Sequence, residues 1–512
     1  MGALTTVESL LGVALTLRGH RVRFLLCDHV LPACLRIHLG KIKDTSIITD
    51  KRLNAEICPQ CYCRGEAIYR ETQLPVLNYS SFLRPGDREL AARQAALLDP
   101  LVRPDGQQGV DYEHALAGTL RFFARGTLDW SEEQVGVFRN YYEAALLTRV
   151  IIKRCLKKYK VKHACFHHGI YIPQGIIGDE CRAEGLHVVN WQVAYRKSCF
   201  IFSHHDTYHR TLMDEPASLW EDITWDDTLE NQTMGYLEAR RHGREDWIWF
   251  HNQPNEDIDK LREELQIDPS KPLISALTNV FWDAQLHYKA NAFPNMLAWL
   301  IDTIDYFKTR PDLQLAIRIH PAEIRGGIPS RQPLTEEIRK AYPSLPSNII
   351  VIPPENECST YALAEASDSV IIYGTKTGVE LAARGTPVIV AGEAWIKNKG
   401  ITRDVRDPAD YRAALDELPY ARRMTDAATS RAKKYAFHFF FRRFMPLPIV
   451  QPSTNPKEPF NLDIESLEDL LPGKNSCLDQ ICEAIVNDQI PFVYQAEKHI
   501  TPTPVAPSNI LA

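Results

Sequence analysis

Apolar positions alternate along the chain between short continuous runs and longer stretches at helical spacing, in two series separated by a polar region. In the first series, an amphipathic stretch near 5–18 precedes the apolar run 21–29, and a long amphipathic stretch, 134–160, precedes the runs 161–169 and 186–192. Apolar residues every three or four positions indicate a helix, and a short apolar run between turn residues indicates a buried strand. Strands that alternate with helices favour a parallel sheet covered by helices.

The second series is the more regular of the two. Its apolar runs predict strands at 272–280, 313–321, 348–354, 369–373 and 387–392, with helical stretches between them. The whole pattern therefore predicts an α/β protein, and its 512 residues are enough for two domains and further segments.

Changes in composition divide the chain into four predicted segments. Residues 1–225 form an N-terminal Rossmann-like domain with a cysteine-rich insertion, and 226–265 form a polar, tryptophan-containing connection. A second domain occupies 266–425, and 426–512 contain a crossing helix and a proline-rich tail. Residues 40–130 show no clear period, so we expect them to be irregular.

Charge and hydropathy exclude two classes of protein. The net charge of −6 is unlike the basic surface of a nucleic-acid binder, so we expect no nucleic-acid partner. No apolar run reaches the roughly 18 residues of a membrane span, and the start of the chain lacks the basic residues of a secretion signal. We therefore expect a cytoplasmic protein.

Polar side chains stand after four successive strands of the second series. They are Asn279 and Asp283, then His320 and Glu323, then Ser359 and Thr360, and last Thr375, Lys376, Thr377 and Gly378, with Glu380 just beyond. Ligands of open parallel sheets bind beyond the carboxyl ends of the strands. The sequence therefore predicts one binding cleft lined by four strand ends.

The turn at 374–378 carries two hydroxyl groups and a lysine between two glycines. Such a turn at the start of a helix favours an anion, and Glu380 either complements the helix dipole or binds two sugar hydroxyls. The glycine spacing does not fit a P-loop, so ATP-driven phosphoryl transfer is not supported. Alternatively, the threonines only end a strand and cap a helix, and His320 is a hydrogen-bonded structural residue.

Four stretches together point to a family. LTNVFWDAQ, IRIHPAE, STYALAEASDSVIIYGTKTGVELAARGTPVIVAG and RAKKYAFHFFFRRF resemble bacterial capsule polysaccharide biosynthesis proteins and related surface-glycan glycosyltransferases of the GT-B architecture. The likeness is best over about 265–445. The resemblance implies two facing Rossmann-like domains with parallel sheets and a cleft between them, 1–225 for the acceptor and 266–425 for the sugar donor.

The resemblance also implies a reaction, the transfer of a sugar from a nucleotide-sugar donor to a glycan or lipid-linked acceptor in surface polysaccharide synthesis. It places His320 near the phosphate of the donor, with Thr375 and Thr377 on the same phosphate. It also places Glu380 near the ribose or the donor sugar, and Ser359 and Thr360 near the nucleobase of the donor. No cofactor is required if these groups stabilise the charge that the leaving phosphate gains, so we expect metal independence. Two alternatives stay open, a non-hydrolysing nucleotide-sugar epimerase and a non-catalytic glycan-binding or assembly protein.

An inverting transfer needs a general base, which the N-terminal domain should supply. His168 follows the apolar run that starts at 161 and is the first candidate, and Asp28 follows the first apolar run and is the second. Alternatively, these residues satisfy backbone groups or bind the acceptor.

Cysteines cluster early in the chain. Cys34, Cys58, Cys61 and Cys63 have a spacing that a structural zinc site tolerates, and free buried thiols or a redox pair are the alternatives.

Two further segments allow contact with a membrane surface. The basic run 153–163 either complements a helix dipole or contacts anionic lipid, and the aromatic run 435–444 either packs across the two domains or lies on a membrane. A lipid-linked acceptor would place the protein at the periphery of the inner membrane face.

Overall fold

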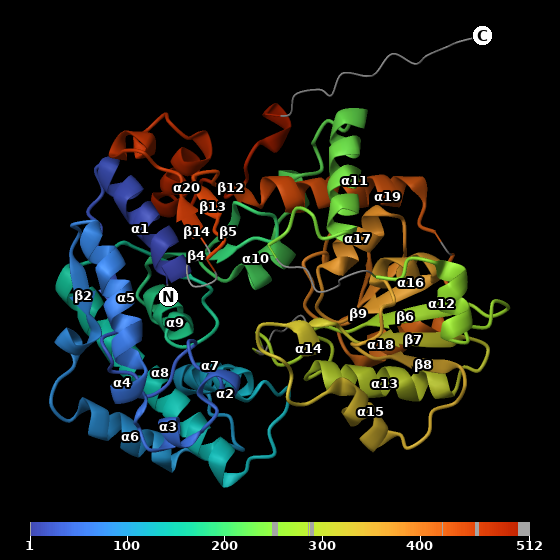
Figure 1. Ribbon diagram of the computed structural model, residues 1–512, viewed down its shortest axis with the longest axis horizontal. Helices are drawn as coiled ribbons and strands as arrows, with labels where there is room; N and C mark the ends of the chain where they lie inside the picture. Colours follow the sequence, from blue (N-terminus) through green and yellow to red (C-terminus); the bar gives the residue numbers. More distant parts are fainter. Residues whose placement is uncertain are drawn as a thin grey trace.

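The second apolar series forms one six-stranded parallel sheet in the computed structural model (Figure 1). The structure describes residues 2–247, 254–284, 286, 291–421, 423–455 and 460–499. The strands of this sheet are β6 (Leu273–Leu277), β7 (Gln314–Arg318), β8 (Ile349–Ile352), β9 (Ser369–Ile372), β10 (Val388–Val390) and β11 (Arg403–Asp404). Every residue of β6, β7, β9 and β10 is buried, as expected for strands with helices on both faces of the sheet.

The strand order is β11-β10-β9-β6-β7-β8. Counted from β6, this is 3-2-1-4-5-6, the order of Rossmann sheets. The helices of this domain are α13 (Met296–Lys308), α14 (Ala322–Arg325), α15 (Leu334–Ala341), α16 (Thr360–Ala366), α17 (Thr377–Ala383) and α18 (Pro408–Asp416). Successive residues of β9 belong to the hydrophobic cores on opposite faces of the sheet. Ile371 is in the core with Trp299 of α13, and Ile372 is in the core with Leu381 of α17.

The N-terminal domain is also α/β, as predicted. Its strands are β1 (Phe24–Leu26), β2 (Val76–Asn78), β3 (His163–His167), β4 (His187–Val193) and β5 (Cys199–His204). The pairs β1–β2 and β3–β4 are parallel, whereas β4 and β5 are antiparallel. The five residues between β4 and β5 explain this difference, because a parallel crossover needs a dozen or more.

Residues 40–130 are mostly helical, so the expectation of irregular structure there is wrong. The helices of the N-terminal domain are α1 (Gly2–Leu17), α2 (Leu39–Ile42), α3 (Ser46–Thr49), α4 (Leu53–Glu56), α5 (Cys58–Glu71), α6 (Asp87–Leu97), α7 (Gly106–Phe123), α8 (Glu132–Tyr159), α9 (Gln174–Ala183) and α10 (Tyr208–Asp214). The helix α7 packs against both α8 and α9 and is buried on more than one side. Its apolar positions therefore do not repeat with the period of a surface helix.

The end of the chain returns to the N-terminal domain. Two helices, α11 (Asp227–Arg241) and α12 (Ile258–Glu264), precede the second sheet, and α19 (Asp426–Phe437) follows it and packs against α17 and α11 (Figure 1). The remaining elements are β12 (Met445–Pro446), β13 (Val450–Pro452), β14 (Phe460–Leu462) and α20 (Ser476–Val486). Strand β12 pairs with β5, so the N-terminal sheet is completed by the end of the chain.

The aromatic run after α19 is part of the core between the two domains. A π-helical turn, His438–Arg442, follows α19, and Phe437, Phe439, Phe440 and Phe444 have no exposed surface. The prediction that this run packs across the two domains is therefore confirmed, and the alternative that it lies on a membrane is not. Within the described residues, none of the helices combines the length and the hydropathy that crossing a bilayer requires.

Candidate functional site

The crevice of the second sheet lies between β6 and β9. The chain leaves β6 toward β7 and β8 on one side and then crosses to β9 on the other, which makes this pair the topological switch point, where open α/β sheets bind ligands. A Cβ atom at Gly374 would lie 2.9 Å from the carbonyl oxygen of Glu393 and 3.8 Å from Asn279 Oδ1. The loops after β6, β9 and β10 therefore meet closely at Gly374.

The hydroxyl turn after β9 is held by its own hydrogen bonds. Thr375 Oγ1 donates to Thr377 Oγ1 at 3.1 Å and accepts from the Thr377 backbone N–H at 3.3 Å. Gly378 has a packing role, because a Cβ there would lie 2.5 Å from Ile372 Cδ1. The turn thus presents two part-buried hydroxyl groups beside the switch point.

Lys376 lies at the seam between the domains. Its Nζ is 3.7 Å from Glu380 Oε1 and 4.4 Å from the ring centre of Tyr195, which follows β4 in the N-terminal domain. Burial, reinforced by the charge of Arg240 and opposed by Glu380, lowers the pKa of Lys376 to about 8. The lysine is therefore still charged at neutral pH.

Glu380 is fully buried and engaged by protein groups. It accepts hydrogen bonds from Arg240 and from the hydroxyl of Tyr361. Burial opposes its charge, but Arg240, Lys376 and the Tyr361 hydroxyl hold the pKa of Glu380 below its ordinary value. The structure thus gives this carboxylate a supporting role toward Lys376, where the sequence suggested a place near the ribose or the sugar.

The end of β7 lies two strands away from β9 and its hydroxyl turn, with β6 between them. With strands about 4.8 Å apart, His320 and Thr375 are separated by on the order of 10 Å, which one bound nucleotide can span. His320 Nδ1 accepts a hydrogen bond from the Ala322 N–H at 3.0 Å, so a neutral imidazole carries its proton on Nε2. Glu323 is buried, and burial raises its pKa to about 7.

Ser359 and Thr360 begin α16 beyond β8. Ser359 Oγ accepts from the Ala362 N–H at 3.4 Å and donates to Glu256 Oε1 at 2.8 Å. Ser359 therefore caps the start of α16 and does not lie with the groups at the switch point.

His168 is brought to the same seam from the N-terminal domain. It follows β3 with a positive φ of 68°, its N–H donates to the Trp191 carbonyl at 2.8 Å, and its ring lies 5.2 Å from that of Tyr171. The Tyr171 hydroxyl in turn donates to Asp283 Oδ1 at 2.5 Å. Burial, followed by the neighbouring imidazoles of His167 and His209 and by Arg121, lowers the pKa of His168 well below its ordinary value, so the imidazole is in the neutral form that can accept a proton.

The second candidate base is held elsewhere. Asp28 accepts hydrogen bonds from the N–H and the hydroxyl of Ser80, within the N-terminal domain.

Sequence reasoning missed Glu393, which follows β10. Burial raises its pKa well above the ordinary value, and its Oε1 has no hydrogen-bond partner in the part of the chain that the structure describes. Trp395, two residues after Glu393, packs against Tyr208 and His209 of α10, with distances between ring centres of 5.5 and 5.7 Å. The run VIVAGEAW has the same strand-end pattern as the other four strands, so this signal was available in the sequence.

The cysteines of the predicted zinc site are all free thiols. Cys58 and Cys61 lie on α5, Cys63 is exposed, and burial raises the pKa of Cys34 to about 12. Among the described residues no group of three or more histidine, cysteine or acidic side chains could hold a metal ion. The structure therefore adds no support for zinc, which stays a prediction.

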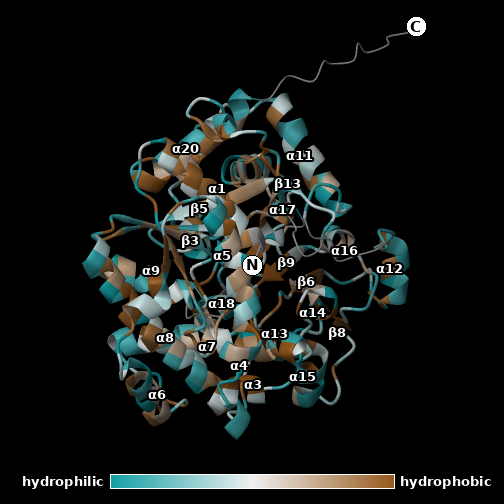
Figure 2. Cartoon of the chain, turned by 60° about the vertical axis from the view of Figure 1, so that its left-hand side comes forward, coloured by the Kyte–Doolittle hydropathy of each residue, from teal (hydrophilic) through white to brown (hydrophobic). Residues whose placement is uncertain are grey.

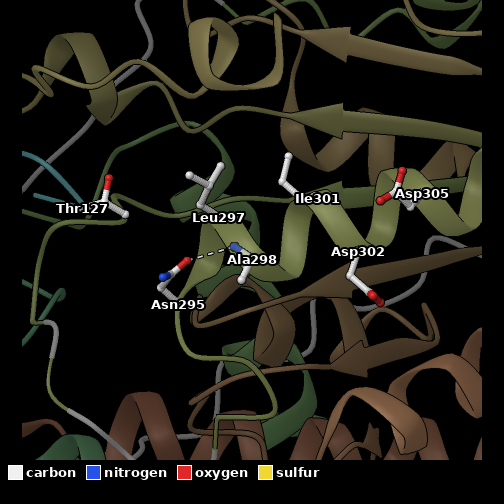
Figure 3. A pocket seen from close by; sticks show the side chains of 7 residues that line it. All are labelled: Thr127, Asn295, Leu297, Ala298, Ile301, Asp302 and Asp305. Atoms are coloured by element: carbon white, nitrogen blue, oxygen red, sulfur yellow. Dashed lines mark hydrogen bonds between the residues drawn. The ribbon is translucent and has the colours of Figure 1, made fainter. Parts of the chain in front are cut away.

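A hollow of about 410 Å³ lies along α13 and is also lined by Thr127 of the N-terminal domain (Figure 3). Its polar groups already have partners, since Asn295 caps α13 by accepting from the Ala298 N–H and Asp302 pairs with Arg412. This hollow contacts none of the predicted site residues and is not the candidate site.

Comparison with known proteins bears on this sheet directly. Residues 253–433 match the family model described as capsule polysaccharide biosynthesis protein. This part of the chain is similar to capsule polysaccharide biosynthesis proteins, and the match covers about a third of the 512 residues. The match covers the six-stranded sheet with the loops after β6, β7, β9 and β10, and it confirms the resemblance that the sequence indicated.

Solved structures give weaker likenesses. The beta Kdo 2,4 transferase KpsC of Thermosulfurimonas dismutans is 12% identical, with 61% of this chain and 88% of that chain covered at a TM-score of 0.37. A UDP-GlcNAc 2-epimerase from Neisseria meningitidis is 11% identical, with 58% and 79% covered at a TM-score of 0.24. No curated protein matches the chain significantly.

Proposed function

We propose that the protein is a glycosyltransferase of the GT-B type that moves a sugar from a nucleotide-sugar donor to a glycan or lipid-linked acceptor. The observation that best supports this proposal is the hydrogen bond between Tyr171 and Asp283. It brings the loop after β3 against the loop after β6, which belongs to the six-stranded sheet that matches the capsule family model. Groups from both domains thus surround one switch point, as a two-substrate reaction requires.

In this proposal the donor phosphate lies at the hydroxyl turn. Thr377 donates a hydrogen bond to it, and Thr375 does so when its hydroxyl turns from Thr377 to the phosphate. Lys376 supplies positive charge that stabilises the leaving nucleotide as the anomeric bond breaks. His320, with its proton on Nε2, faces the same phosphate from the end of β7. These groups do the work that a metal ion would otherwise do, so the reaction is metal-independent in the proposal.

On the acceptor side, His168 takes the proton of the attacking hydroxyl. Its neutral imidazole lies beside the ring of Tyr171. The protein acts in the cytoplasm, and a lipid-linked acceptor would bring it to the membrane surface.

Binding and turnover test the proposal separately. Thermal unfolding with CMP-, UDP-, GDP- and dTDP-sugars should give a shift for one nucleotide, because a ligand at 100 times its Kd stabilises the folded state by about 2.7 kcal/mol. Thr375→Ala should weaken this binding, whereas His168→Gln should keep binding and lose nucleotide release in the presence of acceptor. An epimerase would convert the donor without an acceptor, and an assembly protein would show no turnover in any variant. Either result would refute the transferase assignment.

A further inference from the structure

Large apolar side chains are exposed at one edge of the N-terminal domain. They are Leu90, Leu97, Leu101 and Val102, with exposures of 51, 81, 69 and 59%. Leu90 and Leu97 are seven residues apart and therefore lie on one face of α6. The opposite face, with Ala91 and Ala95, is buried where α6 packs on α8 (Figure 2). Exposed apolar side chains this close together in the chain are a candidate interaction site.

The start of α6 adjoins the basic end of α8. Arg154 of α8 donates to the Phe82 carbonyl oxygen at 2.8 Å and pairs with Asp87, the first residue of α6. Exposed cations lie near this junction: Arg84, Arg88, Lys157 and Lys158 belong to the ends of the two helices or adjoin them, and Arg23 lies over the ring of Tyr159 at the end of α8. None of them forms an ion pair with a carboxylate among the described residues. No acidic residue occurs between Glu143 and Asp179, so this positive charge is not offset along the chain.

We propose that α6, the following loop to Val102 and the cations at the end of α8 form a docking surface for an anionic lipid bilayer. Leucines along α6 enter the boundary between headgroups and acyl chains, while lysines and arginines at the start of α6 and the end of α8 bind the lipid phosphates. Arg88 and Arg93 interrupt the leucines along α6, an arrangement that suits a headgroup layer better than the apolar centre of a protein interface. This inference concerns where the protein binds and does not depend on the sugar-transfer reaction.

Co-sedimentation of the full chain with vesicles tests the docking surface. The protein should sediment with equimolar phosphatidylglycerol and phosphatidylcholine and not with phosphatidylcholine alone, and raised salt should release it. Leu97→Asp should weaken binding about tenfold or more, and so should Lys157→Glu combined with Lys158→Glu. The matched control is Leu467→Asp, because Leu467 is 62% exposed in a short helical turn, Leu467–Leu470, on another part of the chain. All these side chains are exposed, so thermal unfolding should be unchanged.

Three outcomes would overturn the proposal. The wild-type protein could fail to bind anionic vesicles, or Leu97→Asp could bind as well as Leu467→Asp. Light scattering could instead show a dimer that Leu97→Asp dissociates, which would assign the surface to a second copy of the chain. Nucleotide-sugar binding measured in the same variants should be unaffected, so failure here is distinguishable from failure of the proposed reaction.

Discussion

Tyr171 of the N-terminal domain donates a hydrogen bond to Asp283 of the C-terminal domain, with 2.5 Å between Oη and Oδ1. The same hydroxyl accepts from the Ala284 N–H at 2.7 Å. One phenol therefore fixes the loop after β6 against the segment that carries His168. This contact is one of several between the domains, and it is the one that joins the loop after β6 to the segment of the proposed base.

Replacing Tyr171 by phenylalanine should lower turnover more than stability. The variant loses both hydrogen bonds, but Asp283 is exposed enough to be hydrated, so the free energy of unfolding should fall by only about 1 kcal/mol. Turnover should fall by at least tenfold, because a loop displaced by about 1 Å misplaces the reacting groups. Urea unfolding and steady-state kinetics measure the two effects.

The control is Tyr306→Phe, which removes a similar hydrogen bond, to Asp416, inside one domain. It should leave turnover unchanged. Equal losses of turnover in the two variants would show that the contact between domains has no special role.

Donor binding should weaken as the pH rises through about 8. Burial, together with Arg240, lowers the pKa of Lys376 to about 8, and a bound phosphate would raise it again. The charged form that attracts the phosphate is therefore nearly complete at about pH 6 to 7 and is lost as the pH rises through about 8, and above that pH affinity should fall by up to tenfold per pH unit.

Calorimetric titration of the nucleotide found by screening, at several pH values, measures this effect. Lys376→Arg keeps its charge at all these pH values and should flatten the profile. A profile that stays steep in the arginine variant would assign the pH dependence to another group, such as Glu323, whose pKa is about 7.

The sheet of the second domain could be predicted because each strand is a continuous apolar run that ends in a turn. Residues that act across the domains could not be predicted in the same way. Tyr171 and His209 become neighbours of Asp283 and Trp395 only when the domains pack, and no spacing in the sequence records that contact. The sequence predicts Glu380 near a ligand, because a carboxylate just after a strand end is suited to binding one. In the structure it is instead bound in the core by Arg240, which lies 140 residues earlier in the chain, and no spacing in the sequence reveals the pair.

Glu380→Gln should destabilise the fold strongly. Arg240 and Glu380 are 3% and 0% exposed, and removing one partner of a buried ion pair costs about 3 kcal/mol or more. The free energy of unfolding in urea should fall by this amount. Glu56→Gln is the control, because the pair of Glu56 with Arg52 is exposed on both sides and should contribute less than about 0.5 kcal/mol. Similar losses in the two variants would contradict the assigned role of Glu380.

Acid should destabilise the protein through a chain of histidines at the edge of the N-terminal sheet. His163 Nδ1 lies 3.3 Å from His187 Nδ1, His187 Nε2 lies 2.9 Å from His204 Nδ1, and His204 Nε2 contacts the Ile490 carbonyl oxygen at 2.8 Å. The chain thus ties the segment after α20 to β3, β4 and β5.

Burial, with the neighbouring imidazoles, lowers the pKa of His187 to about 4, although Asp488 opposes this shift. The neutral form is therefore favoured in the folded state, and its stabilising effect is complete above the ordinary pKa near 6.5 and is lost as the pH falls toward 4. The midpoint of thermal unfolding should accordingly drop between about pH 7 and pH 5, and it should drop less in His187→Gln, which cannot take up the proton. His242→Gln, a change at the partly exposed end of α11, should keep the wild-type drop. Equal drops in wild type and His187→Gln would exclude this histidine as the source of acid sensitivity.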